Sequence, residues 1–127
     1  ISGPSNEAAR NWYIHNHMPV IAYSSLGRGL FSGRLKSQEA DRAAEVLDPV
    51  AMKGYGYPEN FERLRRCEEL AQEKNCTVSQ IAMSWLFHQE VNTFAVVSTS
   101  SAARMQQNID AMYIELSQKE LLYLDLR

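Results

Sequence analysis

Residues 20–34, which read VIAYSSLGRGLFSGR, decide the fold of this 127-residue chain. The run at 20–23 is apolar without alternation, which predicts a strand covered on both faces, as in a parallel sheet. The glycines at positions 27, 29 and 33 predict a loop, because glycine lets backbone amides approach a ligand closely. They equally allow an ordinary tight turn. The segment therefore predicts a strand that runs directly into a candidate binding loop.

The chain repeats this pattern once. The apolar run FAVV at 94–97 predicts a second strand, and the hydroxyl-rich loop STSS at 98–101 follows it directly. The sequences TVSQ at 77–80 and SQKE at 117–120 are capping boxes, which start helices. The expected helices are 5–16 with Ser5 as its cap, one from residue 60, one over 78–89, and those opened at 98–101 and 117–120.

The stretch at 36–58 lacks a clear pattern. It mixes charged residues with two prolines and two glycines, and only 40–47 has helical spacing. We expect a long, partly mobile loop over 36–58.

The order of the elements predicts the fold class. Strands that alternate with helices are typical of consecutive βα units in a parallel α/β sheet. Two strands cannot close a barrel, and a complete (β/α)8 TIM barrel needs about 250 residues. We therefore expect residues 1–127 to form a single partial domain, a helix-rich section of an incomplete barrel. The unpaired strand edges would favour self-association of the isolated chain.

Composition argues against several classes of function. With a formal net charge of -2, the chain offers no broad basic surface for nucleic acid or an anionic membrane. Its apolar runs are far shorter than the roughly 20 residues that span a bilayer. The chain begins with Ile1 instead of methionine, so we expect it to be cut from a longer protein. The lack of a secretory pattern favours a cytoplasmic location.

The cysteines and histidines match no metal site. Cys67 and Cys76 lie at no short metal or redox spacing, and we expect both to be reduced and structural. His15, His17 and His88 have no acidic or cysteine neighbours at metal-binding spacing, and we expect each at a helix end facing water.

The loops after the two strands are the candidate functional sites, since ligands of parallel α/β folds bind beyond the carboxyl ends of strands. Ser24, Arg28 and the glycine backbone offer donors suited to a pyrophosphate. The serines at 98–101 stand at a helix start, where free amides and the helix dipole attract an anion. The alternative is that these serines are only helix caps and that both loops are ordinary turns.

Both loops resemble segments of the aldo-keto reductases. Residues 23–34, YSSLGRGLFSGR, closely resemble the family's segment after barrel strand seven, Y-S-P-L-G-x-G-L-L-T-G-K. Residues 98–109, STSSAARMQQNI, resemble its strand-eight segment G-T-S-K-x-x-R-L-x-E-N-L, and 114–121, IELSQKEL, resemble L-x-L-T-x-E-E-L. The resemblance implies the carboxyl-terminal section of a (β/α)8 barrel, with strands seven and eight and their helices.

The resemblance also implies a dinucleotide cofactor. Tyr23 would stack on the nicotinamide ring and orient the face that bears the hydride. Its alternative role is that of a buried aromatic residue at a strand end. Ser24, Leu26 and Arg28 would line the pyrophosphate, with Arg34 in place of the usual lysine.

At the adenosine end, the implied binding residues belong to the second loop and the helix after it. Thr99 and Arg104 would approach the 2′-phosphate beside Ser98, and Gln107 and Asn108 would reach the adenine. Three serines depart from the family pattern. Ser25 stands where proline is common, Ser98 where glycine or lysine is common, and Ser101 where lysine is common. Positive charge near the 2′-phosphate is thereby reduced, so NADP is favoured while NAD stays open.

No motif matches the family's catalytic aspartate, tyrosine, lysine and histidine, which lie on earlier strands. The resemblance implies the cofactor-binding section of an NAD(P)H-dependent oxidoreductase that moves a hydride between nicotinamide and a carbonyl or alcohol carbon, inactive by itself. Its partners would be the amino-terminal part of the barrel and a small-molecule carbonyl substrate. Two alternatives stay open: a cofactor-sensing regulatory subunit of the same fold, and a purely structural helical domain. Upstream sequence separates the enzyme from the sensor, because the enzyme keeps the four catalytic residues.

Overall fold

The computed structural model describes residues 6–127, and a two-stranded parallel sheet lies at its centre. Strand β1 (Val20–Ala22) pairs with β2 (Thr93–Ala95), and Ala22 lies opposite Ala95. The Val96 amide extends the pairing by donating to the Ala22 carbonyl at 2.9 Å. The expected parallel α/β arrangement is confirmed, and both strands end at the same edge of the sheet.

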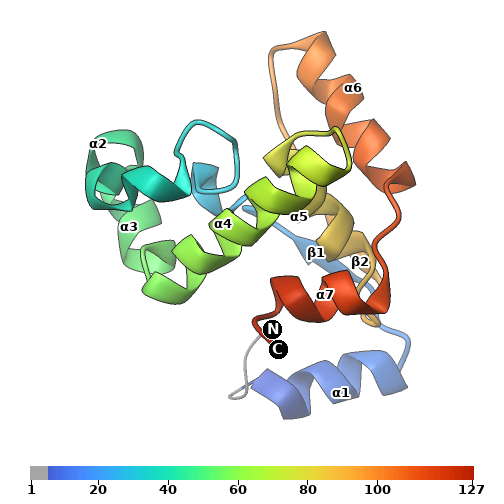
Figure 1. Cartoon of the computed structure of the whole chain (residues 1–127). Coiled ribbons are helices and arrows are strands. Elements are labelled where there is room, and N and C mark those ends of the chain that lie inside the picture. Colours follow the sequence, from blue (N-terminus) through green and yellow to red (C-terminus); the bar gives the residue numbers. More distant parts are fainter. Residues whose placement is uncertain (1–5) are drawn as a thin grey trace.

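Helices make up most of the rest of the described chain. Figure 1 shows α2 and α3 together at one end of the molecule, with α1 and α6 at separate corners and the strands near the middle. None of the helices among residues 6–127 has the length and apolar character needed to cross a membrane. The helices are α1 (Glu7–His15), α2 (Ala43–Val46), α3 (Pro49–Tyr55), α4 (Pro58–Glu73), α5 (Val78–Phe87), α6 (Ala102–Asp110) and α7 (Gln118–Leu124), with 3-10 turns η2 (Gly27–Gly29), η3 (Ser37–Arg42) and η4 (Ala111–Tyr113).

Local sequence signals set the starts of the helices. Thr77 and Ser117 open the two expected capping boxes, before α5 and α7. Helix α4 begins at Pro58, slightly before its expected start, because proline fits a first helical position where no amide hydrogen is needed. Asn6 precedes α1, and the cap expected at Ser5 lies outside the described residues.

The hydrophobic core lies where α4 and α5 pack against the segment after the first loop. Leu64, Cys67 and Leu70 form a buried apolar face of α4. Leu30 and Leu35, within and after the loop at residues 23–34, are fully buried, so this loop is anchored in the core. We call residues 23–34 the glycine loop. The other buried residues of this cluster are Ala43, Leu47, Ala51, Ala71, Val78, Ile81, Leu116 and Leu124.

Residues 36–58 do not form the loop expected from the sequence. The turn η3 and the helices α2 and α3 occupy most of the segment, and Leu47 and Ala51 are buried in the core. Helix α3 begins after Asp48, whose Oδ1 accepts a hydrogen bond from the Ala51 amide at 2.8 Å, and Pro49 takes the first helical position. Helix α2 lies within the stretch 40–47 that was expected to be helical. The expectation of irregular structure is wrong for α3, because a capping aspartate followed by proline starts a helix too short to show periodicity. The mobility of the segment stays a prediction.

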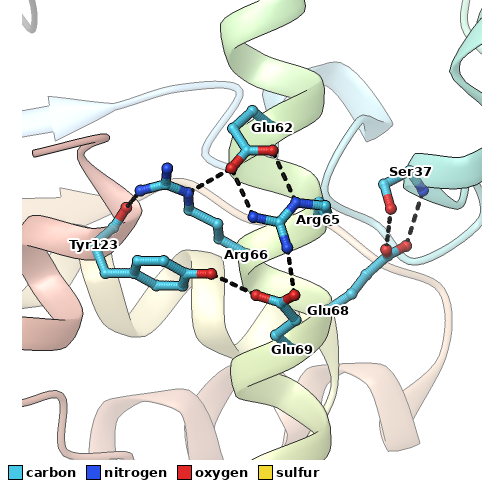
Figure 2. Close-up of polar contacts among 7 residues, drawn as sticks. All are labelled: Ser37, Glu62, Arg65, Arg66, Glu68, Glu69 and Tyr123. Atoms are coloured by element: carbon cyan, nitrogen blue, oxygen red, sulfur yellow. Dashed lines mark hydrogen bonds and ion pairs between the residues drawn. The ribbon is translucent and has the colours of Figure 1, made fainter.

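A polar network joins α4 to α7 (Figure 2). Glu62 accepts hydrogen bonds from Arg65 and Arg66, each at 2.7 Å. Arg66 also donates to the Tyr123 carbonyl at 2.6 Å, and its guanidinium lies 4.4 Å from the centre of the Tyr123 ring. The Tyr123 hydroxyl in turn donates to Glu69 at 2.5 Å. Charged side chains of α4 thus hold α7 against it.

The sheet keeps one apolar face open among the described residues. Ile21, Tyr23, Phe94 and Val96 follow the strand alternation on this face and are 71%, 80%, 55% and 52% exposed. The expectation that the strands are covered on both faces is therefore wrong for these residues, since the described helices leave this face to solvent. Parallel sheets are stable where structure packs on both faces, so the open face is suited to be covered by a further layer of structure.

The open face predicts that the 127-residue chain self-associates when it is produced alone. Large contiguous apolar patches rarely stay exposed to water. The double variant Ile21→Lys, Phe94→Lys should shift the chain toward monomer, because burying the added charges is unfavourable. Light scattering coupled to size-exclusion chromatography measures the mass directly. A monodisperse monomer of the unsubstituted chain would contradict the prediction.

Glu62 predicts an acid-dependent contribution to stability. Hydrogen bonds from Arg65 and Arg66 lower the pKa of the Glu62 carboxyl from 4.5 to about 2. Because the pKa of Glu62 is lower in the folded than in the unfolded chain, the ionised carboxylate stabilises the fold at pH values above about 4.5. This contribution to the free energy of unfolding is lost as the pH falls from about 4.5 to about 2. Melting temperatures of Glu62→Gln should depend less on pH in this window than those of the unsubstituted chain. The exposed control Glu115→Gln should keep the original dependence, and identical pH profiles for all three proteins would refute the assignment.

Candidate functional site

The glycine loop is a succession of tight turns. Gly27, Gly29 and Gly33 have φ values of 58°, 104° and 81°, in the left-handed region that glycine adopts without strain. The amides of Gly27 and Gly29 donate to the carbonyls of Ser24 and Leu26 at 2.8 and 3.1 Å. Because these amides hold the turn together, we expect side chains to provide the main donors for a ligand.

Tyr23 and the residues after it form the first part of the loop. The Tyr23 ring lies on the open face of the sheet, whereas Leu26 is half-buried at the start of η2. Ser24 has a left-handed φ of 54°, which is uncommon outside glycine. Ser25, which stands where the family pattern has proline, donates to the Ala22 carbonyl at 2.9 Å and so fixes the turn with a side chain. The alternative of a buried Tyr23 is wrong among the described residues.

Arg28 lies in the middle of the glycine loop and pairs with an acidic residue of the next segment. Its Nη2 lies 3.3 Å from Oδ2 of Asp48, and the two side chains are 42% and 49% exposed. Asp48 also caps α3 by accepting from the Ala51 amide. That hydrogen bond, followed by the one from Arg28, lowers the pKa of the Asp48 carboxyl. One carboxylate thus links the glycine loop to the start of α3.

Arg34 closes the glycine loop with a second cation. Its Nε donates to Oγ of Ser32 at 3.4 Å, and that hydroxyl donates to the Gly29 carbonyl at 2.6 Å. The Arg34 guanidinium lies so close to Gly29 that a Cβ added there would be 3.0 Å from Nη2. Two arginines therefore flank the same turn, one held by a carboxylate and the other by a hydroxyl.

The hydroxyl loop, residues 98–101, caps the helix after it. Ser101 Oγ accepts from the Arg104 amide at 3.3 Å, and Thr99 Oγ1 accepts from the Ser101 amide at 3.1 Å. The capping interpretation is confirmed for Ser101. Ser98 is exposed and Thr99 is half-buried. Ligand binding by Ser98 and Thr99 stays a prediction.

Helix α6 carries the remaining expected site residues. Arg104, Gln107 and Asn108 share one face, because three- and four-residue spacings place side chains together on a helix. The Gln107 carbonyl accepts from Nε2 of Gln80 at 3.2 Å, which ties α6 to α5 and fixes the position of this polar face. The apolar face expected on α6 and η4 is partly exposed, in Met105, Ile109 and Met112.

The parallel register brings the two loops to one edge of the sheet. Because Ala22 lies opposite Ala95, the glycine loop and the hydroxyl loop both begin just beyond the same pair of residues. The structure therefore places Tyr23 and Ser98 at the same edge, with Arg28, Arg34 and Arg104 on the segments that leave it. What the two loops share is therefore this edge of the sheet.

A cavity of about 810 Å³ lies on the helical side of the molecule and touches the glycine loop at Tyr23, Ser24 and Gly27. Its other walls come from α1, α3, α4, α5 and the residues of α7 and beyond. None of the expected cations Arg28, Arg34 and Arg104 lines it. The arginines that do line it are Arg10, Arg63 and Arg127.

Cys67 and Cys76 are free thiols, and Cys67 packs in the core. Burial raises the pKa of the Cys67 thiol to about 12, so it stays protonated and unreactive at neutral pH. No group of three or more metal-ligating side chains occurs in the part of the chain that the structure describes. His15, His17 and His88 are exposed at or beyond helix ends, as expected.

Asp48 is the site residue that sequence reasoning missed. The dipeptide Asp48-Pro49 is a recognisable helix start, which could have placed the carboxylate at the beginning of α3. Its contact with Arg28 joins residues 20 positions apart and leaves no periodic signal. Only the folded chain shows that the acidic cap meets the cation of the glycine loop.

A parallel βα section with a glycine loop and a hydroxyl loop at one edge is consistent with part of a (β/α)8 barrel. The model of the aldo/keto reductase family matches residues 6–126, and the chain belongs to this family. It is 26% identical over 102 residues to probable aldo-keto reductase 1 of Glycine max and 22% identical over 103 residues to aldo-keto reductase str7 of Strobilurus tenacellus. Both matches cover 80% of this chain, but only 30% and 31% of the relatives, so the chain spans about a third of their length.

The positive φ of Gly29 and its closeness to Arg34 predict that replacing this glycine lowers the stability of the fold. Gly29→Ala should destabilise the fold by about 1 kcal/mol or more, because alanine is strained at positive φ. It should also displace the Arg34 guanidinium. Gly33→Ala is the matched control, since its φ of 81° brings the same kind of strain but its Cβ meets nothing within 4 Å. Chemical denaturation should show a larger loss for Gly29→Ala; equal losses would exclude a contribution from the Arg34 contact.

Proposed function

We propose that this chain is the carboxyl-terminal, cofactor-binding section of an NAD(P)H-dependent oxidoreductase acting on carbonyl or alcohol substrates. The parallel register of β1 and β2 carries the proposal, because it brings the glycine loop and the hydroxyl loop to one edge. A dinucleotide is an extended ligand that needs binding groups spread along such an edge. Membership of the aldo/keto reductase family supports the same ligand.

The nicotinamide end fits Tyr23. Its ring is 80% exposed on the open face, so one side is available as an aromatic platform. When bound, the cofactor supplies or accepts the hydride. Tyr23 would only orient the ring, and the structure packed on the open face would exclude water from it.

The pyrophosphate fits the two arginines of the glycine loop. The guanidinium groups of Arg28 and Arg34 flank one turn, and planar donor pairs can bind phosphate oxygens bidentately. Ser24 would add a hydroxyl, and Leu26 would shape the wall. The left-handed backbone of Ser24 and Arg28 supports a binding role, because strained residues outside glycine cluster at ligand sites.

The adenosine end fits the start of α6. Arg104 lies in its first turn, where the positive end of the helix favours an anionic 2′-phosphate, and Ser98 and Thr99 precede it. Gln107 and Asn108 would reach the adenine from the same face of the helix. Because one arginine provides the cation there, we propose NADP as the preferred cofactor, with NAD also accepted.

The proposal assigns proton chemistry to parts of the barrel outside residues 1–127. An aspartate, tyrosine, lysine and histidine there would act on a small carbonyl compound, in a cytoplasmic protein. The amino-terminal strands of the barrel would pack on the open face that contains Ile21 and Phe94. Residues 1–127 alone would then bind no substrate and show no turnover.

Titration of the complete protein with NADPH and NADH tests the proposal. Arg104→Ala should weaken NADPH binding by about tenfold or more and NADH binding much less, because only NADPH carries the 2′-phosphate. The control Arg42→Ala removes an exposed arginine that pairs with Glu39 and Glu45, and both affinities should stay unchanged. Equal losses for both nucleotides would contradict the 2′-phosphate assignment. Failure of the unsubstituted protein to bind either nucleotide would contradict the proposed function.

A further inference from the structure

Arg28 is the cation of the glycine loop that already has an acidic partner. Its Nη2 lies 3.3 Å from Oδ2 of Asp48, whereas Arg34 is held by the hydroxyl of Ser32. A carboxylate and a phosphate make the same kind of charge-assisted hydrogen bond to a guanidinium. Asp48 therefore uses a donor of Arg28 that a pyrophosphate would also use.

Asp48 is held in place independently of Arg28. Its other oxygen, Oδ1, accepts from the Ala51 amide at 2.8 Å. The neighbouring Leu47 is buried in the core. At the start of the same segment, Ser37 donates to Glu68 of α4 through its amide at 3.0 Å and through its hydroxyl (Figure 2). The carboxylate is thus anchored to the fold.

The Arg28 side chain is free to change partners. It is 42% exposed, and the single contact with Asp48 leaves other guanidinium donors for a second anion. An exposed ion pair of this kind is weak and is weakened further by salt. A pyrophosphate brings at least two negative charges and can therefore take Arg28 away from Asp48.

We propose that Asp48 is an internal competitor for the pyrophosphate of the cofactor: it holds Arg28 when the site is empty and releases it when the dinucleotide binds. The inference rests on the proposed function, because it requires an anion at the glycine loop. Asp48 then acts as a positioning residue that keeps Arg28 beside the turn and lowers the affinity modestly.

The variant Asp48→Asn separates the two roles of this side chain. Asparagine caps a helix as well as aspartate does, so α3 keeps its start, while the negative charge that pairs with Arg28 is lost. NADPH should bind the complete protein about two- to fivefold more tightly at low ionic strength, and the gain should shrink in about 0.5 M salt. Asp48→Ser, which also preserves a cap, should give the same gain.

Two controls identify the cause of the gain. Glu45→Gln removes an equal charge from the same segment, where Glu45 pairs with Arg42, and it should leave the affinity unchanged. In the Arg28→Met background, Asp48→Asn should no longer tighten binding, because no guanidinium remains to be released. A gain that persists in that background would reflect general electrostatics and would overturn the inference.

The remaining outcomes separate the inference from the proposed function. If the unsubstituted protein binds NADPH and neither Asp48→Asn nor Asp48→Ser binds it more tightly, competition by Asp48 is excluded and the proposed function stands. If the unsubstituted protein binds neither NADPH nor NADH, the proposed function and the inference fail together. Thermal unfolding of each variant shows that α3 and its surroundings stay folded during the comparison.

Discussion

Parallel pairing of β1 with β2 is the constraint on which the rest of the structure depends. Neighbouring parallel strands need a long crossover connection, and residues 23–92 provide it here. The crossover has to return to the starting end of the sheet, and α4 and α5 make this return while burying Leu64 and Ile81. The same pairing makes both strands end at one edge. The hydrophobic core and the proposed cofactor site are thus two consequences of one set of backbone hydrogen bonds.

Features encoded within a few residues were predictable from the sequence. The capping boxes at Thr77 and Ser117 and the buried stripe through Leu64 and Cys67 depend only on neighbours in the chain, and the structure confirms them. The strands were predictable for the same reason, apart from small shifts of their ends. The positive φ of Gly29 follows from its residue type, although its amide holds the turn instead of being presented to a ligand.

Features that depend on distant residues were not predictable. Arg66 meets the Tyr123 carbonyl across 57 positions, and Arg28 meets Asp48 across 20, so no local pattern reports either contact. Helix α3 has seven residues, too few to show helical periodicity, whereas α2 lies within the stretch 40–47 that has helical spacing in the sequence. The burial of both helices depends on how α4 folds back. For the proposed site, this means that residue types suggested a ligand chemistry, whereas the acidic partner of Arg28 appeared only in three dimensions.

The proposed cofactor contacts differ in whether they lie on the open face of the sheet or beyond its edge. Tyr23 lies on the same face as Ile21 and Phe94, so a nicotinamide stacked on it is shielded from water only when further strands cover that face. Stacking and hydride chemistry both depend on this exclusion of water. Arg28 and Arg104 lie on segments beyond the sheet edge, and their attraction for phosphate does not require a closed barrel. Under the proposed function, the groups that would bind the phosphates are therefore held within this chain, whereas orientation of the nicotinamide would depend on the completed barrel.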